Sequence, residues 1–144
     1  MARGARPRGD EDERSDARER ALLLLYEAES KSIAPGDVVE IQVLSPDELT
    51  QQLVHGVERY GREIDDLIAT HAKGWTLQRM PTIDRNVLRI GVYELLHRQD
   101  VPVAVVINEA VELVKRFSTD DSGKFVNGVL AAIAPKTRVA TGPT

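Results

Sequence analysis

Segment 118–130 holds the side chains best suited to binding chemistry, and its sequence is STDDSGKFVNGVL. Free backbone amides at a helix start attract phosphate or a base carbonyl, and Lys124 adds a positive charge to that start. The buried stripe is expected to begin at Val126, so Phe125 is rotated by about 100° from it. Phe125 is then either a stacking platform for an unpaired base or a rim residue packed on the preceding helix through Phe117. The residues alone leave both interpretations open.

Asp121 has two candidate roles, as the N-cap of this helix or as an acceptor for an amine on a base edge. Neither Asp65-Asp66 nor Asp120-Asp121 is expected to form an acid/base dyad, because neighbours on a helix point about 100° apart. Three histidines without metal-binding spacing are expected at the surface or at helix ends: His55, His71 and His97. No glycine-rich nucleotide motif or serine-hydrolase motif occurs. The sequence therefore predicts a binding protein with no catalytic residue, metal site or cofactor.

The composition favours helices as the elements that position these residues. A chain of 144 residues, 42% of them hydrophobic, matches one domain with a single core. Aromatic residues make up only 4% of the chain, which suits packed helices better than a sandwich or barrel of strands. There is no cysteine and no apolar run of the roughly 18 residues that span a bilayer. We therefore expect a cytoplasmic protein without a membrane partner.

The N-terminal segment separates its charges. Arg3, Arg6 and Arg8 come first, and four consecutive acids follow at positions 10–13. The net charge of −4 would by itself argue against a nucleic-acid partner. The distribution of charge along the chain matters more than this total. We expect residues 1–15 to form a flexible charged arm, residues 16–134 to form the folded domain and residues 135–144 to form a flexible tail.

Hydrophobic periodicity predicts an all-α, single-domain bundle of about six to seven helices. The first helix should begin near Asp16 and end before the turn at Pro35-Gly36. Residues 37–44 alternate like a strand but have no strand to pair with, so we expect a short helix or a loop there. Ser45 should cap a helix that runs to about His71 and breaks or bends near Gly61.

The second half of the chain should contain the central helix. After a short turn capped by Thr76, Thr82 is expected to cap a helix whose apolar residues cover most of its circumference. Another helix should follow the segment 100–102 and run to Phe117. The last helix should end at Ala134-Pro135.

Segment 121–130, DSGKFVNGVL, resembles the signature of the bacterial transcription antitermination factor NusB family. Four other stretches agree with that family in the same order. They are ARERA at 17–21 followed by Leu25-Tyr26, GWTLQR at 74–79 before IDRNVLRI at 83–90 and YELL at 93–96, DVP at 100–102, and INEAVEL at 107–113. The match spans roughly residues 14–133, and several dispersed motifs in one order are far more specific than one pattern.

The resemblance implies an all-helical, non-catalytic protein that binds the boxA RNA of ribosomal RNA transcripts together with NusE, a small-subunit ribosomal protein. Both would act within the RNA polymerase antitermination complex. Carried over by position, the RNA-binding residues are Arg14, Arg18, Asp121, Lys124 and Phe125. The residues that the resemblance assigns to the NusE-facing surface are Tyr26, Gln78 and Asp84.

The chain departs from the family pattern at two places. The family has a run of arginines before its Ala-Arg-Glu motif, whereas this chain has Arg14-Ser15-Asp16, and an acid there should repel phosphate. The connection over residues 31–48 is also shortened.

Two alternative functions remain. One is the NusB-like RNA-binding module of a ribosomal RNA methyltransferase system, which the lack of a downstream cofactor domain in these residues disfavours. The other is a homodimeric interaction protein that buries the RNA face and binds no RNA.

Overall fold

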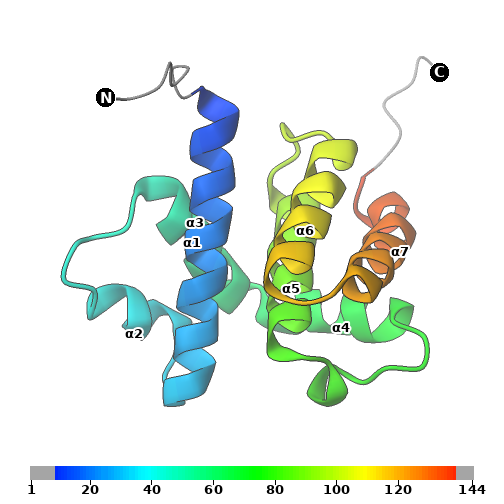
Figure 1. Ribbon diagram of the computed structural model, residues 1–144, viewed down its shortest axis with the longest axis horizontal. Helices are drawn as coiled ribbons and strands as arrows, with labels where there is room; N and C mark the ends of the chain where they lie inside the picture. The colour runs from blue at the N-terminus through cyan, green and yellow to red at the C-terminus, as the bar shows by residue number, and fades with distance from the viewer. Residues whose placement is uncertain (1–8, 139–144) are drawn as a thin grey trace.

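Seven α-helices and one short 3-10 helix make up residues 9–138, the part of the chain described by this computed structural model, and no strand occurs there (Figure 1). The elements are α1 (Asp10–Lys31), α2 (Pro35–Glu40), α3 (Glu48–Arg59), α4 (Gly61–His71), η1 (Leu77–Arg79), α5 (Thr82–His97), α6 (Val103–Phe117) and α7 (Asp120–Thr137). This order confirms the predicted all-α bundle.

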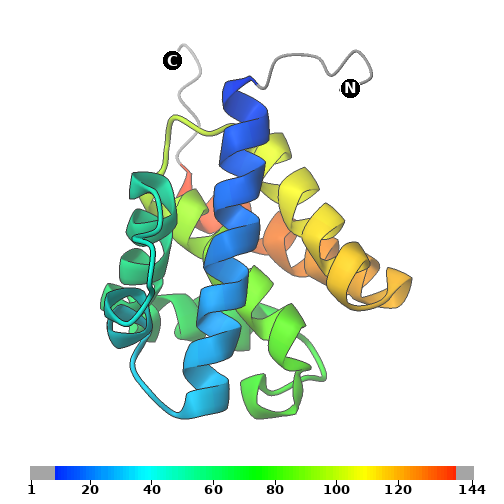
Figure 2. The ribbon, with the colours of Figure 1, turned by 60° about the vertical axis from the view of Figure 1, so that its left-hand side comes forward.

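Helix α5 lies at the centre, as its nearly complete apolar circumference predicts. It contacts α1, α3, α4, α6 and α7, and Val87, Leu88 and Leu95 on it are fully buried. Figure 2 shows α1 in front of this central helix, with α2 and α3 on one side and α6 and α7 on the other. Gly91 lets α7 approach closely, because a Cβ there would lie 2.9 Å from Leu130 Cδ1. This contact fixes α7 against α5.

Helix α1 begins at Asp10, six residues before the predicted start at Asp16. Its first turn consists of four acids, whose negative charges are favourable at the positive end of a helix dipole. The Gly9 amide also donates to Asp12 Oδ2 at 3.4 Å. The whole acidic part of the predicted arm is therefore helical, while Arg3, Arg6 and Arg8 lie outside the described residues.

The region after α1 tests three of the sequence predictions. The strand-like stretch begins within helix α2 and continues into a turn, which confirms the short helix. Helix α3 is capped by Asp47, whose carboxylate accepts from the Thr50 amide at 2.7 Å, so the predicted cap at Ser45 is wrong. Of the break or bend predicted near Gly61, the structure shows a break, at Tyr60 between α3 and α4.

Helix α7 continues three residues beyond Ala134 and contains Pro135. A proline near a C-terminus removes only one amide from the helix ladder, which explains why the predicted end was too early. Arg138 follows and donates to four backbone carbonyls around the end of α5, including that of Leu95 at 2.9 Å. This contact ties the end of α7 to α5.

Candidate nucleic-acid interface

The first turn of α7 presents two predicted RNA-binding residues to the surface. Asp121 and Lys124 are both exposed. The helix is capped by Thr119, whose hydroxyl accepts from the Ser122 amide at 3.0 Å, so Asp121 is not the N-cap. The Asp121 carboxylate is consequently available at the surface for other donors.

A cavity of about 250 Å³ lies beside this turn, between α7, the start of α5 and the loop before η1. We call it the α5–α7 cavity. Its apolar walls are Trp75, Met80, Pro81 and Phe125. The Phe125 ring lies 6.3 Å from the Trp75 ring, centroid to centroid, in an edge-on arrangement at 60°. Phe125 is partly buried, whereas Trp75 is 49% exposed.

The aromatic neighbour of Phe125 is thus Trp75, and the predicted packing through Phe117 is not what the structure shows. Sequence reasoning missed Trp75 as a site residue. The available signal was the pair Gly74-Trp75: Gly74 has φ of +81°, a conformation that suits glycine and turns the chain so that the only tryptophan is half exposed. An exposed tryptophan beside a second ring is a suitable base-stacking surface.

The polar side of the cavity is formed by Asp84, Asp121 and Ser122. Asp84, which the resemblance assigned to a protein-facing surface, is only 3% exposed. Its Oδ2 accepts from the Ser122 hydroxyl at 2.7 Å, which joins the start of α5 to the start of α7. The structure therefore places Asp84 beside the RNA-binding candidates Asp121 and Phe125, and its assignment to the NusE-facing surface stays a prediction.

A second, shallower hollow adjoins the first turn of α7 on its α6 side. Lys115 and Lys124 both line it, together with Asn127. Gly123 leaves room for the Lys115 side chain, because a Cβ there would lie 3.0 Å from Lys115 Cγ. Lys115 is a second cation that sequence reasoning missed, and its place three residues before segment 118–130 was the available signal.

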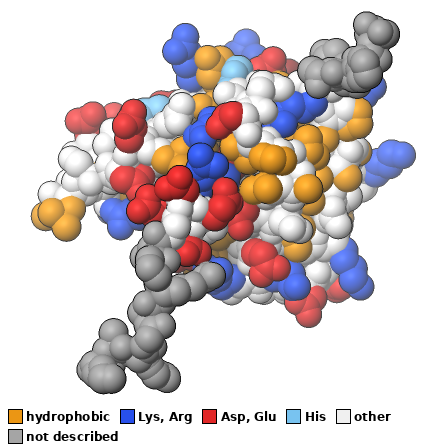
Figure 3. Space-filling model, turned by 90° about the horizontal axis from the view of Figure 1, so that it is seen from above, with side chains coloured by type: hydrophobic (Ala, Val, Ile, Leu, Met, Phe, Trp, Pro, Cys, Tyr) orange, Lys and Arg blue, Asp and Glu red, His pale blue; other side chains and the backbone are white. Residues whose placement is uncertain are grey.

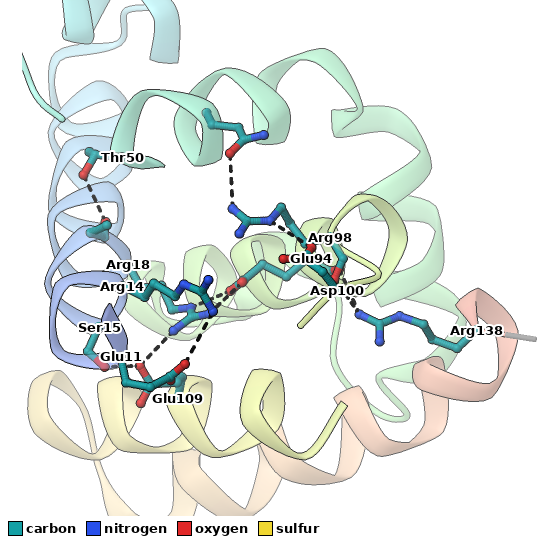
Figure 4. Close-up of polar contacts among 12 residues, drawn as sticks. Glu11, Arg14, Ser15, Arg18, Thr50, Glu94, Arg98, Asp100, Glu109 and Arg138 are labelled. Carbon is teal, nitrogen blue, oxygen red and sulfur yellow. Dashed lines mark hydrogen bonds and ion pairs between the residues drawn. The ribbon is translucent and has the colours of Figure 1, made fainter. Parts of the chain in front are cut away.

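Arg18, predicted to contact RNA, is 2% exposed and cannot reach a phosphate in this structure. Figure 4 shows its guanidinium bound by Glu94 of α5, at 2.8 and 2.9 Å, and by Glu109 of α6, at 3.0 Å. Burial alone would lower the pKa of Arg18, but the hydrogen bonds and charges of the two glutamates outweigh it and raise the pKa. The prediction of an RNA contact for Arg18 is therefore replaced by a structural role.

Arg14 lies in an acidic setting. It is partly exposed, and its guanidinium is 3.4 Å from Glu11 Oε1. Figure 3 shows acidic side chains gathered beside the start of α1. A hollow of that region is lined by several acids from α1 and α6: Asp12, Asp16, Glu19, Glu109 and Glu112. Negative charge at this density opposes phosphate binding.

The two remaining predicted partner residues are accessible. Tyr26 on α1 is 46% exposed, and Gln78 on η1 is exposed. Arg85 connects these elements, because it donates to the Leu77 carbonyl at 2.9 Å and pairs with Glu29 on α1.

The described residues contain no group of three or more potential metal ligands. His55 is exposed, and His71 and His97 lie at the ends of α4 and α5, as predicted. None of the helices in residues 9–138 is long and apolar enough to cross a membrane.

Residues 15–135 match the model of the NusB family. The chain belongs to the NusB family. Among curated NusB relatives, the transcription antitermination protein NusB of Saccharopolyspora erythraea is 54% identical over 127 residues, which cover 84% of this chain and 86% of that protein. The protein of the same name from Thermobifida fusca is 47% identical over 137 residues, covering 92% and 94%.

Solved NusB structures share the fold. NusB of T. maritima superposes with a TM-score of 0.76 at 36% identity, covering 85% of this chain and 91% of that one. A crystal structure of the antitermination factors NusB and NusE in complex with dsRNA gives a TM-score of 0.73 at 35% identity, covering 85% and 96%.

Proposed function

We propose that this NusB-family chain is a non-catalytic factor of transcription antitermination that binds boxA RNA together with NusE in the RNA polymerase antitermination complex, and therefore acts in the cytoplasm. Family membership and the names of its relatives support this role. The structural observation that carries it is the α5–α7 cavity, where two accessible aromatic rings lie beside Lys124 and the start of a helix. Stacking rings and cations together suit single-stranded RNA.

Within this proposal, the α7 side supplies most of the RNA contact. Phe125 and Trp75 offer ring faces to bases, and Lys115 and Lys124 offer charge to the backbone phosphates. NusE would contact the accessible side chains of Tyr26 and Gln78. Arg14 has at most a minor part, because it pairs with Glu11 in a helix whose first turn is acidic.

Fluorescence anisotropy of a labelled boxA RNA, titrated with the protein in the presence and absence of NusE, tests the proposal. We expect saturable binding that NusE strengthens and that weakens steeply as salt increases. A labelled RNA of scrambled sequence is the control. Failure to bind boxA RNA under low salt with NusE present would refute the function. Light scattering of the same samples would distinguish an RNA complex from the alternative homodimer that excludes RNA.

A matched chain lacking residues 1–8 tests the predicted arm. If Arg3, Arg6 and Arg8 contribute phosphate contacts, their removal should lower the salt dependence of boxA binding. Unchanged salt dependence would place recognition in residues 9–138.

A further inference from the structure

Asp84 is a deeply buried carboxylate with one oxygen engaged and one oxygen free. Its Oδ2 accepts from Ser122 Oγ, and Asp84 is 3% exposed. Within residues 9–138, Asp84 Oδ1 is buried and has no hydrogen-bond partner. A buried acceptor without a donor is unfavourable, so such an atom in a native fold needs an explanation.

A second buried carboxylate, that of Glu94, has a structural role and provides a comparison for Asp84. Glu94 is 2% exposed, and both of its oxygens accept from the Arg18 guanidinium. Asp84 Oδ1 is the one buried side-chain polar atom among the described residues that has no partner. Because Asp84 lines the α5–α7 cavity, a molecule that enters the cavity can supply the missing donor.

The cavity restricts what that molecule can be. Its volume of about 250 Å³ is below the roughly 300 Å³ at which pockets for drug-sized ligands begin, which suits one flat ring system. The Trp75 and Phe125 rings supply apolar faces for it. At the polar end, a carboxylate oxygen can only accept a hydrogen bond. The ligand group that meets Asp84 must therefore carry an N–H or O–H.

Building on the proposed RNA-binding function, we propose that the α5–α7 cavity binds one unpaired base that carries an exocyclic amino group, and that Asp84 Oδ1 accepts a hydrogen bond from this group. Cytosine N4, adenine N6 and guanine N2 are such donors. Uracil has a ring N–H but presents a carbonyl at position 4, where cytosine presents its amine, and Asp84 repels that carbonyl. Among pyrimidines, the cavity therefore selects cytosine over uracil.

A cationic side chain of a protein partner could also donate to Asp84, but the surroundings favour a base. Lys124 lies next to Phe125 in the chain, and Lys115 joins it in the adjoining hollow. These two cations lie on the α6 side of the first turn of α7, together with Asp120, whereas the cavity itself is lined by Asp84 and Asp121. The two cations attract the phosphates that accompany a base.

The first test compares labelled single-stranded oligocytidine and oligouridine of equal length by anisotropy, using the full chain. The wild type should prefer oligocytidine by about tenfold, the size expected of one hydrogen bond to a charged group. Asp84→Asn keeps an oxygen for Ser122 but replaces Oδ1 by an amide that donates, so the preference should disappear or reverse. Asp120→Asn removes the same charge in the first turn of α7, where Asp120 lines the adjoining hollow, and should keep the wild-type preference.

The second test changes the RNA and leaves the protein intact, so it holds even if Asp84→Asn does not fold. Oligocytidine whose N4 carries two methyl groups has no donor and should bind the wild type about tenfold more weakly than oligocytidine. Oligo-5-methylcytidine adds a methyl group but keeps the amine, so it controls for bulk and should bind like oligocytidine.

Three results would overturn the proposal. Equal affinity for oligocytidine and oligouridine, with boxA binding intact, would refute selection of the amine but leave the RNA-binding function standing. Unchanged base preference in folded Asp84→Asn, with weaker binding of NusE, would assign Asp84 to the protein partner. Absence of binding to every RNA, boxA included, would instead refute the function on which the proposal rests.

Discussion

The starts of α1 and α7 both carry residues that were predicted to bind RNA, but the fold uses the two regions differently. In Figures 1 and 2 the start of α1 lies at the top of the molecule and the start of α7 lies well below it. At α1, Arg18 is enclosed and bound to two glutamates. At α7, Lys124 is exposed and Phe125 borders an open cavity.

The two buried acids beside these regions explain the difference. Glu94 beside Arg18 has both oxygens bonded to the guanidinium, so neither oxygen of Glu94 is free for a ligand. Asp84 beside Phe125 has one buried oxygen without a hydrogen-bond partner, and this residue lines a cavity. Asp84 and Glu94 are ten residues apart on α5, about 15 Å along its axis. One central helix thus supports a closed structural junction and an open binding site.

The largest expected effect is on stability, from Arg18→Met. This change leaves Glu94 buried without its partner and should lower the free energy of unfolding by about 3–5 kcal/mol. Urea denaturation followed by circular dichroism measures it. The double variant Arg18→Met/Glu94→Met removes both charges and should recover most of the loss. A stable Arg18→Met protein that no longer binds RNA would show that Arg18 contacts RNA after all.

Phe125→Ala should have the largest effect on RNA binding. Loss of one stacked base costs about 1–3 kcal/mol, which corresponds to roughly 5- to 150-fold weaker binding of boxA RNA by the folded variant. Phe117→Ala is the matched control, because Phe117 is also partly exposed but does not line the cavity. Equal losses in the two variants would contradict a specific role for the cavity.

Lys124→Ala should change the salt dependence more than the base preference. Removing one phosphate contact to a single strand should reduce the slope of log affinity against log salt by about 0.7. Lys136→Ala is the control, since Lys136 is exposed at the far end of the same helix. An unchanged slope for Lys124→Ala would remove this residue from the interface.

The smallest effect is expected from Arg14→Ala. Arg14 is partly exposed and paired only locally with Glu11, so its removal should change stability by no more than about 0.5 kcal/mol. Its boxA affinity should stay within about twofold of the wild type, because phosphate is disfavoured in this acidic region. A loss comparable to that of Phe125→Ala would restore α1 to the RNA interface.

The residues predicted well from sequence depend on local patterns. The helical period that separates Phe125 from Val126 lies within one turn, and both the partly buried ring and the fully buried valine follow from it. Arg18 and Asp84 depend instead on partners far along the chain. Arg18 meets Glu94 across 76 residues, and Asp84 meets Ser122 across 38. No pattern in the neighbouring sequence indicates that a distant partner will bury a side chain. Both residues were therefore predicted to contact a binding partner at the surface.

The fluorescence of Trp75 gives the most direct test that RNA binds in the α5–α7 cavity, because Trp75 is the only tryptophan of the chain and lines that cavity. Titration with unlabelled boxA RNA should change its emission and saturate at the affinity that anisotropy gives. In Phe125→Ala the midpoint should move to higher RNA concentration. Full RNA binding by anisotropy with no change in Trp75 emission would show that the RNA binds elsewhere.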